Sequence, residues 1–293
     1  RGTRGTLVSL AAEGSSALAA RARHDPSVLA ALASLDWFAF ANVDHGAASP
    51  VSRFDAATGD AVLGDAWIDD RAKFVAWRGA LRDDPEAGLA AGAPWRFVDR
   101  TLGDAASVAI GAAGESNQVV FASDAGDTVS GGAKVDRLHG GRGDDTLDGS
   151  GGDDLVEGAG GDDVLAGGDG DDRLEGGAGD DRLTGGAGHD HLAGGSGHDV
   201  YAFARGEGAD VIDDADAQGE IVVDGATLTG REVDVSYSTQ DYGVGGTTLV
   251  VRTDATAASS GEIRIRNWKE GALGIHLDPV AAAGEHGPAA LAD

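Results

Sequence analysis

Seven consecutive nine-residue units fill residues 140–202, and they read GGRGDDTLD, GSGGDDLVE, GAGGDDVLA, GGDGDDRLE, GGAGDDRLT, GGAGHDHLA and GGSGHDVYA. The units follow the pattern G-G-x-G-x-D-x-U-x, in which U is a large apolar residue, with serine or alanine at the second position of the second and third units. The eighth position is apolar throughout: Leu147, Val156, Leu165, Leu174, Leu183, Leu192 and Tyr201. A fixed period of this kind predicts a solenoid, in which each unit packs against its neighbours.

Glycine and aspartate recur at set positions, which indicates a cation site in each unit. Glycine permits backbone conformations that a Cβ would block, so the chain can turn sharply and point carbonyl oxygens inward. The sixth-position aspartate adds carboxylate oxygens, and about six to eight oxygen ligands without imidazole or thiolate favour Ca²⁺ over zinc or copper. The candidate metal ligands are the first and fourth glycines and the sixth-position aspartate of each unit: Gly140, Gly143, Asp145, Gly149, Gly152, Asp154, Gly158, Gly161, Asp163, Gly167, Gly170, Asp172, Gly176, Gly179, Asp181, Gly185, Gly188, Asp190, Gly194, Gly197 and Asp199.

Positions seven to nine of each unit form a minimal strand that is too short to be stable alone. Its apolar eighth residue can be buried only by stacking many copies. The loops in turn need a cation to offset a column of like charges. We therefore expect the strands and the ions to stabilise one another.

Degenerate copies flank the array. GGAKVDRLH begins at residue 131 and ASDAGDTVS at residue 122, and they carry Lys134 and Ala125 in place of the fourth glycine. We expect the sites at Asp136 and Asp127 to be weak or empty. After a two-residue slip, the unit RGEGADVID at residue 205 restores the pattern.

Two other features of the array could take part in metal binding. The fifth position is acidic in five units (Asp144, Asp153, Asp162, Asp171 and Asp180). These carboxylates are either ligands or solvated charges, and we favour solvated charges. Three histidines (His189, His191 and His198) could suggest a transition metal, but two of them occupy the variable fifth position, which favours surface residues.

The array resembles haemolysin-type RTX repeats over about 90 residues. The segment VYAFARGEGADVIDDADAQGEIVVDGATLTG resembles the one that commonly follows such repeats. The resemblance implies a right-handed parallel β-roll in which two units make one coil and each Ca²⁺ lies between loops one coil apart. The implied pairs are Asp145 with Asp163, Asp154 with Asp172, Asp163 with Asp181, Asp172 with Asp190, and Asp181 with Asp199. About four to seven ions are expected.

The resemblance also implies where the protein works. It suggests the C-terminal region of a secreted, extracellular bacterial protein that is exported by a type I secretion system, which reads an uncleaved C-terminal signal and passes the chain unfolded. Calcium ions and the type I secretion machinery would then be the partners.

Composition and charge narrow the classes of function. The 293 residues carry 22 basic and 50 acidic side chains, a net charge of −28, which disfavours nucleic acids and anionic lipid surfaces. The chain has no cysteine, which excludes disulfides and thiolate metal sites. No apolar run is long enough to span a bilayer. High charge and many glycines predict an array that is unfolded at low Ca²⁺.

Three zones are expected. Residues 1–112 form a small helical or mixed region, residues 113–212 form the β-roll, and residues 213–293 form a β-rich cap with a tail that carries the secretion signal. The fold class is therefore mainly β, with a small α-containing part before the roll. In the cap, EIVVDGATL, EVDVSYS, TTLVVRT and EIRIRNW predict short antiparallel strands.

The first zone contains two predicted helices and two predicted strands. One helix starts at Asp25-Pro26 and runs to Trp37 and Phe38. Its apolar residues are Val28, Leu29, Leu32 and Leu35. A second helix follows Asp65. Trp67, Phe74, Trp77 and Leu81 share one face of it, with Asp69, Asp70, Arg71 and Lys73 mostly elsewhere. The strands are expected at residues 95–98 and 107–110.

We interpret the chain as a calcium-binding module without a catalytic centre. It has no G-x-S-x-G elbow, H-E-x-x-H helix or glycine-rich phosphate loop. The adjacent pairs His24-Asp25 and Asp44-His45 favour capping or surface roles. The alternatives are the C-terminal part of a lipase-like RTX hydrolase or toxin with its enzyme upstream, and an adhesin stalk. Calcium-triggered self-cleavage at Asp25-Pro26, Asp84-Pro85 or Asp278-Pro279 is a further alternative.

Overall fold

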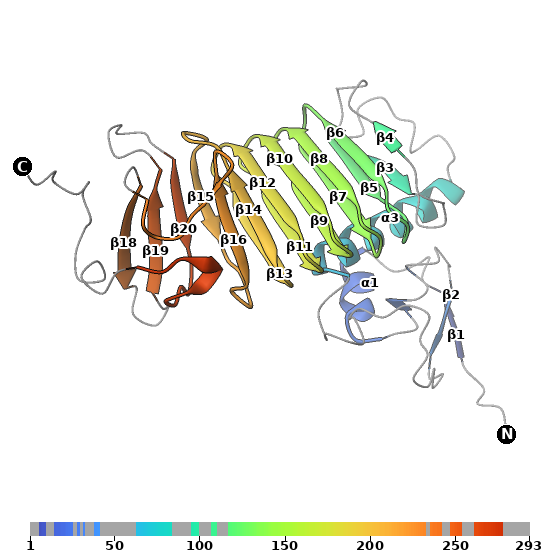
Figure 1. Ribbon diagram of the computed structural model, residues 1–293. Helices are drawn as coiled ribbons and strands as arrows, with labels where there is room; N and C mark the ends of the chain where they lie inside the picture. Colours follow the sequence, from blue (N-terminus) through green and yellow to red (C-terminus); the bar gives the residue numbers. More distant parts are fainter. Residues whose placement is uncertain are drawn as a thin grey trace, which may run out of the picture.

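The computed structural model is an elongated stack of β-strands with helices beside its N-terminal end (Figure 1). It describes residues 6–9, 15–25, 28–29, 32, 38–41, 63–83, 95–99, 107–109, 117–232, 235–241, 247–253 and 261–277. No helix among these residues is long and apolar enough to cross a membrane.

Two sheets make up the stack, and successive strands alternate between them from β3 to β16. The eight-stranded sheet contains, in its spatial order, β17 (Ala226–Thr227), β16 (Gly219–Val223), β14 (Asp199–Phe203), β12 (Arg182–Ala187), β10 (Val164–Asp169), β8 (Thr146–Gly151), β6 (Thr128–Gly132) and β4 (Ser107–Ala109). The ten-stranded sheet contains β18 (Ser236–Asp241), β19 (Thr247–Arg252), β20 (Glu262–Ile265), β15 (Ala209–Ile212), β13 (His191–Ser196), β11 (Arg173–Ala178), β9 (Leu155–Gly160), β7 (Asp136–Gly141), β5 (Asn117–Phe121) and β3 (Trp95–Asp99).

The strands of the array pair in parallel, and neighbours within a sheet are 18 residues apart. Leu165 in β10, for example, is in register with Leu147 in β8 and Leu183 in β12. Two nine-residue units therefore make one coil, and the predicted parallel β-roll is confirmed.

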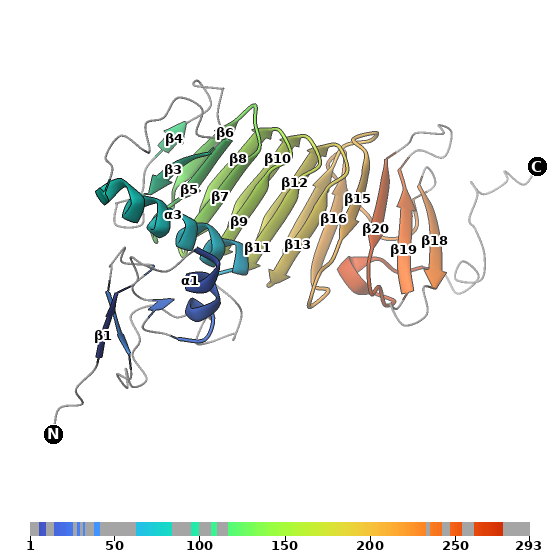
Figure 2. The same ribbon diagram turned by 180° about the vertical axis from the view of Figure 1, so that it is seen from behind.

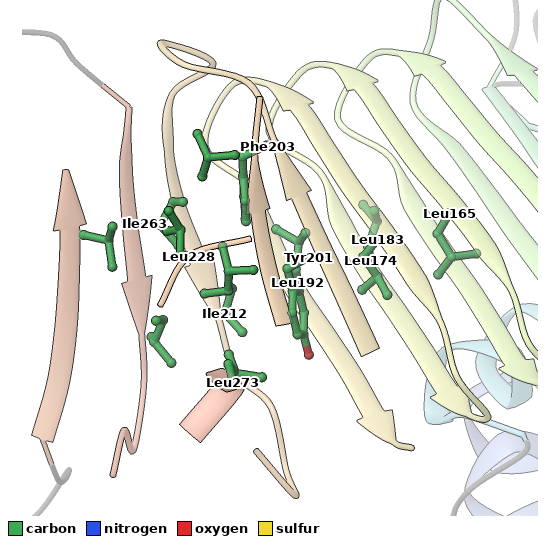
Figure 3. Close-up of a cluster of buried hydrophobic side chains, with 14 of the residues drawn as sticks. Leu165, Leu174, Leu183, Leu192, Tyr201, Phe203, Ile212, Leu228, Ile263 and Leu273 are labelled. Atoms are coloured by element: carbon green, nitrogen blue, oxygen red, sulfur yellow. The ribbon is translucent and has the colours of Figure 1, made fainter. Parts of the chain in front are cut away.

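The eighth-position residues form a continuous apolar strip between the two sheets (Figure 3). Leu165, Leu174, Leu183, Leu192 and Tyr201 are each 0% exposed. One such side chain per unit is a small core, but stacking joins these residues into one cluster that continues into the C-terminal strands. The strip is therefore buried through the coil repeat, as the sequence predicts.

Parallel pairing extends beyond the array on both sides. Strands β3 and β4, which confirm the two predicted strands of the first zone, pair in parallel with β5 and β6. Downstream, β16 pairs in parallel with β14, and β20 with β15. The expectation of an antiparallel strand at EIVVD is therefore wrong in its main pairing, because β16 continues the coil. Strands β18, β19 and β20 pair antiparallel with one another, as predicted, but β20 also pairs in parallel with β15, which was not predicted.

The helices lie against the ten-stranded sheet near β5, β7 and β9 (Figure 2). Helix α1 spans Ser15–Ala22, and α3 spans Asp65–Asp83, which confirms the helix predicted after Asp65. The amides of Val28 and Leu29 donate to the carbonyl of Asp25, where a helix start was expected. Phe38 was predicted to end that helix, but it begins β2 (Phe38–Ala41), which pairs with β1 (Thr6–Ser9).

Two charged residues of α3 lie on its packed face. Asp70 and Arg71 are buried, so the prediction that the charges lie mostly away from the apolar face is wrong for this pair. The partners that make their burial possible come from distant parts of the chain. Several predicted features are outside the described residues: Leu35, Trp37, Asp44, His45, the side chains of Trp77 and Leu81, the Asp84-Pro85 and Asp278-Pro279 bonds, and the tail after Pro279.

Candidate metal sites

The sixth-position aspartates form two ladders, one on each side of the roll. In each ladder, the backbone N–H of one aspartate donates to Oδ1 of the aspartate one coil later. The five expected pairs are all brought together in this way, at N···O distances of 2.7 Å for Asp145 to Asp163, 2.8 Å for Asp154 to Asp172, 2.8 Å for Asp163 to Asp181, 2.9 Å for Asp172 to Asp190, and 3.0 Å for Asp181 to Asp199.

The second oxygen of each of these aspartates is buried and has no hydrogen-bond partner. This holds for Oδ2 of Asp145, Asp154, Asp163, Asp172, Asp181, Asp190 and Asp199. The seven residues are at most 3% exposed. A buried acceptor without a partner costs about 1–3 kcal/mol, and more when it is charged. Seven such oxygens at equivalent positions therefore fit a site for a cation.

The surroundings of these oxygens fit a hard cation. A Cβ placed on Gly167 would lie 2.2 Å from Oδ2 of Asp172 and 2.6 Å from the carbonyl oxygen of Gly185 in the next coil. Carboxylate and carbonyl oxygens thus line a space that leaves no room for a side chain. Similar contacts recur at Gly140, Gly149, Gly158 and Gly176. This oxygen donor set fits Ca²⁺.

The glycines of the unit have different structural roles. Fourth-position Gly170 has φ of +141°, and its Cβ would lie 2.2 Å from the carbonyl oxygen of Gly152, so both its backbone angle and its contacts require glycine. First-position Gly167 has no such φ, and the close oxygens alone exclude a side chain there. This second reason for glycine could not be predicted from conformational freedom alone.

Burial makes the ion-free carboxylates weak acids. It is the main cause that raises the pKa of Asp163 and Asp181 to about 8, and neighbouring aspartates raise these values further. The same causes raise the pKa of Asp145 to about 7. A cation in the ladder would remove both the burial cost and the like-charge repulsion.

The fifth-position aspartates are exposed, yet they are not simply solvated. Oδ1 of Asp144 accepts the N–H of Asp162, and Oδ1 of Asp162 accepts that of Asp180, both at 2.9 Å. Asp153, Asp171 and Asp180 make equivalent bonds to the next coil. This column satisfies backbone amides along the loops, a role that the sequence argument did not include. His189 and His198 are exposed, in agreement with a surface position.

In the two degenerate copies before the array, the second carboxylate oxygen of the aspartate has hydrogen-bond donors, unlike in the seven regular units. Oδ2 of Asp127 accepts hydrogen bonds from the amide and the hydroxyl of Ser123, at 2.7 and 2.6 Å. Oδ2 of Asp136 accepts the N–H of Gly132 at 2.7 Å. Because protein groups already satisfy these oxygens, the geometry agrees with weak or empty sites.

The last unit contains a polar group that the sequence argument treated only as apolar. The hydroxyl of Tyr201 donates to Oδ2 of Asp214 at 2.9 Å and accepts the N–H of Gly194 at 2.8 Å. A Cβ on Gly194 would lie 2.5 Å from this hydroxyl and 2.0 Å from Oδ2 of Asp199. Tyr201 therefore belongs to the apolar strip and also borders the carboxylate of Asp199.

Replacing Gly167 with alanine is expected to raise the calcium concentration needed for folding by about tenfold or more, because overpacking costs about 1–3 kcal/mol. The new methyl group would occupy the oxygen-lined space beside Asp172. Gly151→Ala is the matched control, since the nearest atom to its Cβ is 3.8 Å away. Calcium titrations followed by circular dichroism measure both variants. Equal midpoints for the two would contradict the assignment of this space to the ion.

The comparisons with known proteins agree with this geometry. Residues 130–165 and 166–201 match the family described as RTX calcium-binding nonapeptide repeat (4 copies). No cluster of three or more His, Cys, Asp and Glu side chains that could hold a metal ion is found among the described residues, so the candidate sites consist of paired aspartates and backbone carbonyls. A comparison with curated proteins finds no match. Residues 130–201 are therefore RTX calcium-binding nonapeptide repeats, and they form a parallel β-roll.

Proposed function

We propose that the roll is a calcium-dependent folding module. The observation that carries the proposal is the set of seven buried Oδ2 atoms without partners. Without a cation, folding buries these carboxylates next to one another at a high electrostatic cost. With calcium, the same oxygens become ligands. Because only the folded chain brings these oxygens together, the ion stabilises the folded state and not the unfolded one.

The proposed ligands are the sixth-position aspartates and the carbonyl groups of the first- and fourth-position glycines of the seven units. The five stacked pairs, with further sites at the ends, correspond to about four to seven ions. An ion at ten times its dissociation constant contributes about 1.4 kcal/mol, so five sites would contribute about 7 kcal/mol. This equals the stability of a small domain.

Calcium dependence would place the folded module outside the cell. Extracellular calcium modules bind at about 10⁻⁴ to 10⁻³ M, well above cytosolic levels. An array that stays unfolded before export suits a type I secretion system, and folding would follow in the extracellular medium. In this proposal the roll is a non-catalytic part of a secreted bacterial protein.

A calcium titration of the chain tests the proposal. In chelator, residues 145–199 are expected to lack strand signal by circular dichroism and to exchange their amide hydrogens quickly. Millimolar Ca²⁺ is expected to restore both strand signal and protection, whereas Mg²⁺ at the same concentration is not, because it demands a smaller octahedral site. A roll that is fully protected in chelator would overturn the proposal.

A further inference from the structure

The aspartates at the N-terminal end of the roll differ from the later ones in the hydrogen bonds that their carboxylates accept. From Asp145 to Asp199, Oδ2 of each sixth-position aspartate lacks a partner, whereas Asp127 and Asp136 are satisfied by protein donors. Oδ1 of Asp136 also accepts the N–H of Gln118, at 2.8 Å. The carboxylates that require a cation as partner thus begin at Asp145, directly before β8. In the coils formed by β5, β6 and β7, protein N–H and O–H groups satisfy the carboxylates instead.

A second hydrophobic core covers these same coils. It joins the helical segments to the outer face of β5 and is separate from the strip inside the roll. Phe121 of β5 contacts Trp67 edge-on, with ring centroids 6.0 Å apart, and Phe74 at 6.1 Å. The buried guanidinium of Arg71 lies 4.7 Å from the centroid of the Phe121 ring, and its Nε donates to the carbonyl of Leu32.

A buried ionic cluster holds α3 on the sheet. The ring of His139 in β7 contacts Oε2 of Glu157 through Nδ1 at 2.7 Å and Oδ2 of Asp70 through Nε2 at 3.2 Å. All three residues are at most 5% exposed. Arg137 and Lys73 also bind Asp70. The cluster gives α3 one fixed position, since displacement would leave buried charges unpaired.

Glu157 connects this cluster to the calcium-dependent part of the roll. It lies in β9, three residues after Asp154, and a Cβ on Gly64 at the start of α3 would lie only 3.0 Å from its Oε1. Its neighbour in register, Glu175, instead contacts the exposed Arg173. Glu157 is therefore a specific contact between the helices and the first calcium-dependent coils.

We propose that the helical segments and β5 to β7 form a calcium-independent end of the protein, on which the calcium-dependent coils stack. This rests on the proposed function of the roll, because it concerns where that dependence begins. The end has its own apolar core and satisfied carboxylates, and it contains every member of the ionic cluster except Glu157 of β9. It offers a formed edge, β7, onto which β9 can pair once calcium is present.

Hydrogen exchange of the full chain, read by mass spectrometry in chelator and in millimolar Ca²⁺, tests this inference. In chelator, amides of α1, α3, β5 and β7 are expected to exchange at least about tenfold more slowly than those of β8 to β14. Equal exchange in the two parts would overturn the inference but leave the proposed function intact. Protection of β8 to β14 in chelator would instead overturn the proposed function.

Two pairs of variants make the test sharper. Ser123→Ala removes one hydrogen bond to Asp127 and is expected to speed exchange of β5 to β7 in chelator by about tenfold. Its control is Ser130→Ala, which removes an exposed contact with Ser150. Glu157→Gln is expected to raise the calcium midpoint several-fold, whereas Glu175→Gln leaves it unchanged. If each variant behaves like its control, the inference is wrong.

Discussion

Replacing Asp163 with asparagine is expected to change the stability of the roll in opposite directions with and without calcium. An asparagine oxygen can still accept the N–H of Asp145, which lies 2.7 Å from Oδ1 in the wild type. The substitution removes the charge on the buried Oδ2, whose burial raises the pKa of Asp163 to about 8. In chelator, the variant should therefore be more stable than the wild type. In calcium it should be less stable, because the ion loses a carboxylate ligand.

Calcium titration measures the effect in calcium, and the strand signal by circular dichroism in chelator, where the wild-type array is expected to be unfolded, measures the effect without it. We expect the calcium midpoint to rise at least about tenfold, which corresponds to about 1.4 kcal/mol. Asp162→Asn is the matched control: Asp162 is the neighbouring residue, is exposed and accepts the N–H of Asp180 through Oδ1. It should shift neither quantity appreciably. Equal behaviour of the two variants, or destabilisation of Asp163→Asn in chelator, would count against a ligand role for Asp163.

The array is the part of the fold that sequence predicts best, and its periodicity is the reason. Every unit meets the same surroundings one coil away, so a single spacing of 18 residues predicts the strand register, the apolar strip and the five aspartate pairs together. Leu147, Leu165 and Leu183 occupy one line in the structure because they share one position in the unit. The glycine turns and carboxylates of each unit supply oxygen ligands, which favour Ca²⁺ as the bound ion.

The contacts between the helices and the roll could not be predicted in this way. Asp70 lies 69 residues from His139, and no repeat or spacing relates the two. On α3 alone, a charged residue is expected to face solvent, and burial becomes favourable only when the opposite charges of β7 are in place. The strand β16 shows a similar limit, since its β-branched residues suit parallel and antiparallel pairing equally. Its pairing partner is set by the position of the preceding coil, which places β16 beside β14.

The ion-free roll is expected to be more stable in mild acid than at neutral pH. Burial, followed by repulsion from nearby aspartates, raises the pKa of Asp154 and Asp181 to about 8 and that of Asp172 to about 6, from 3.8. The folded chain therefore holds more protons than the unfolded chain between about pH 4 and pH 8. The associated stability is fully present below the unfolded pKa and is lost as pH rises through the folded values, by about 1.4 kcal/mol per pH unit for each extra proton.

Calcium and protons should then compete for the same oxygens. Because a carboxylate must lose its proton to bind a metal ion, the calcium midpoint is expected to fall as pH rises from about 5 to about 8. Circular dichroism in chelator and calcium titrations at several pH values measure the two trends. Asp163→Asn should reduce the pH dependence of both the stability in chelator and the calcium midpoint by the contribution of one proton, since it removes one titrating group. Stability in chelator that increases with pH would show that these carboxylates are already satisfied without calcium, because only then would folding favour their ionised form.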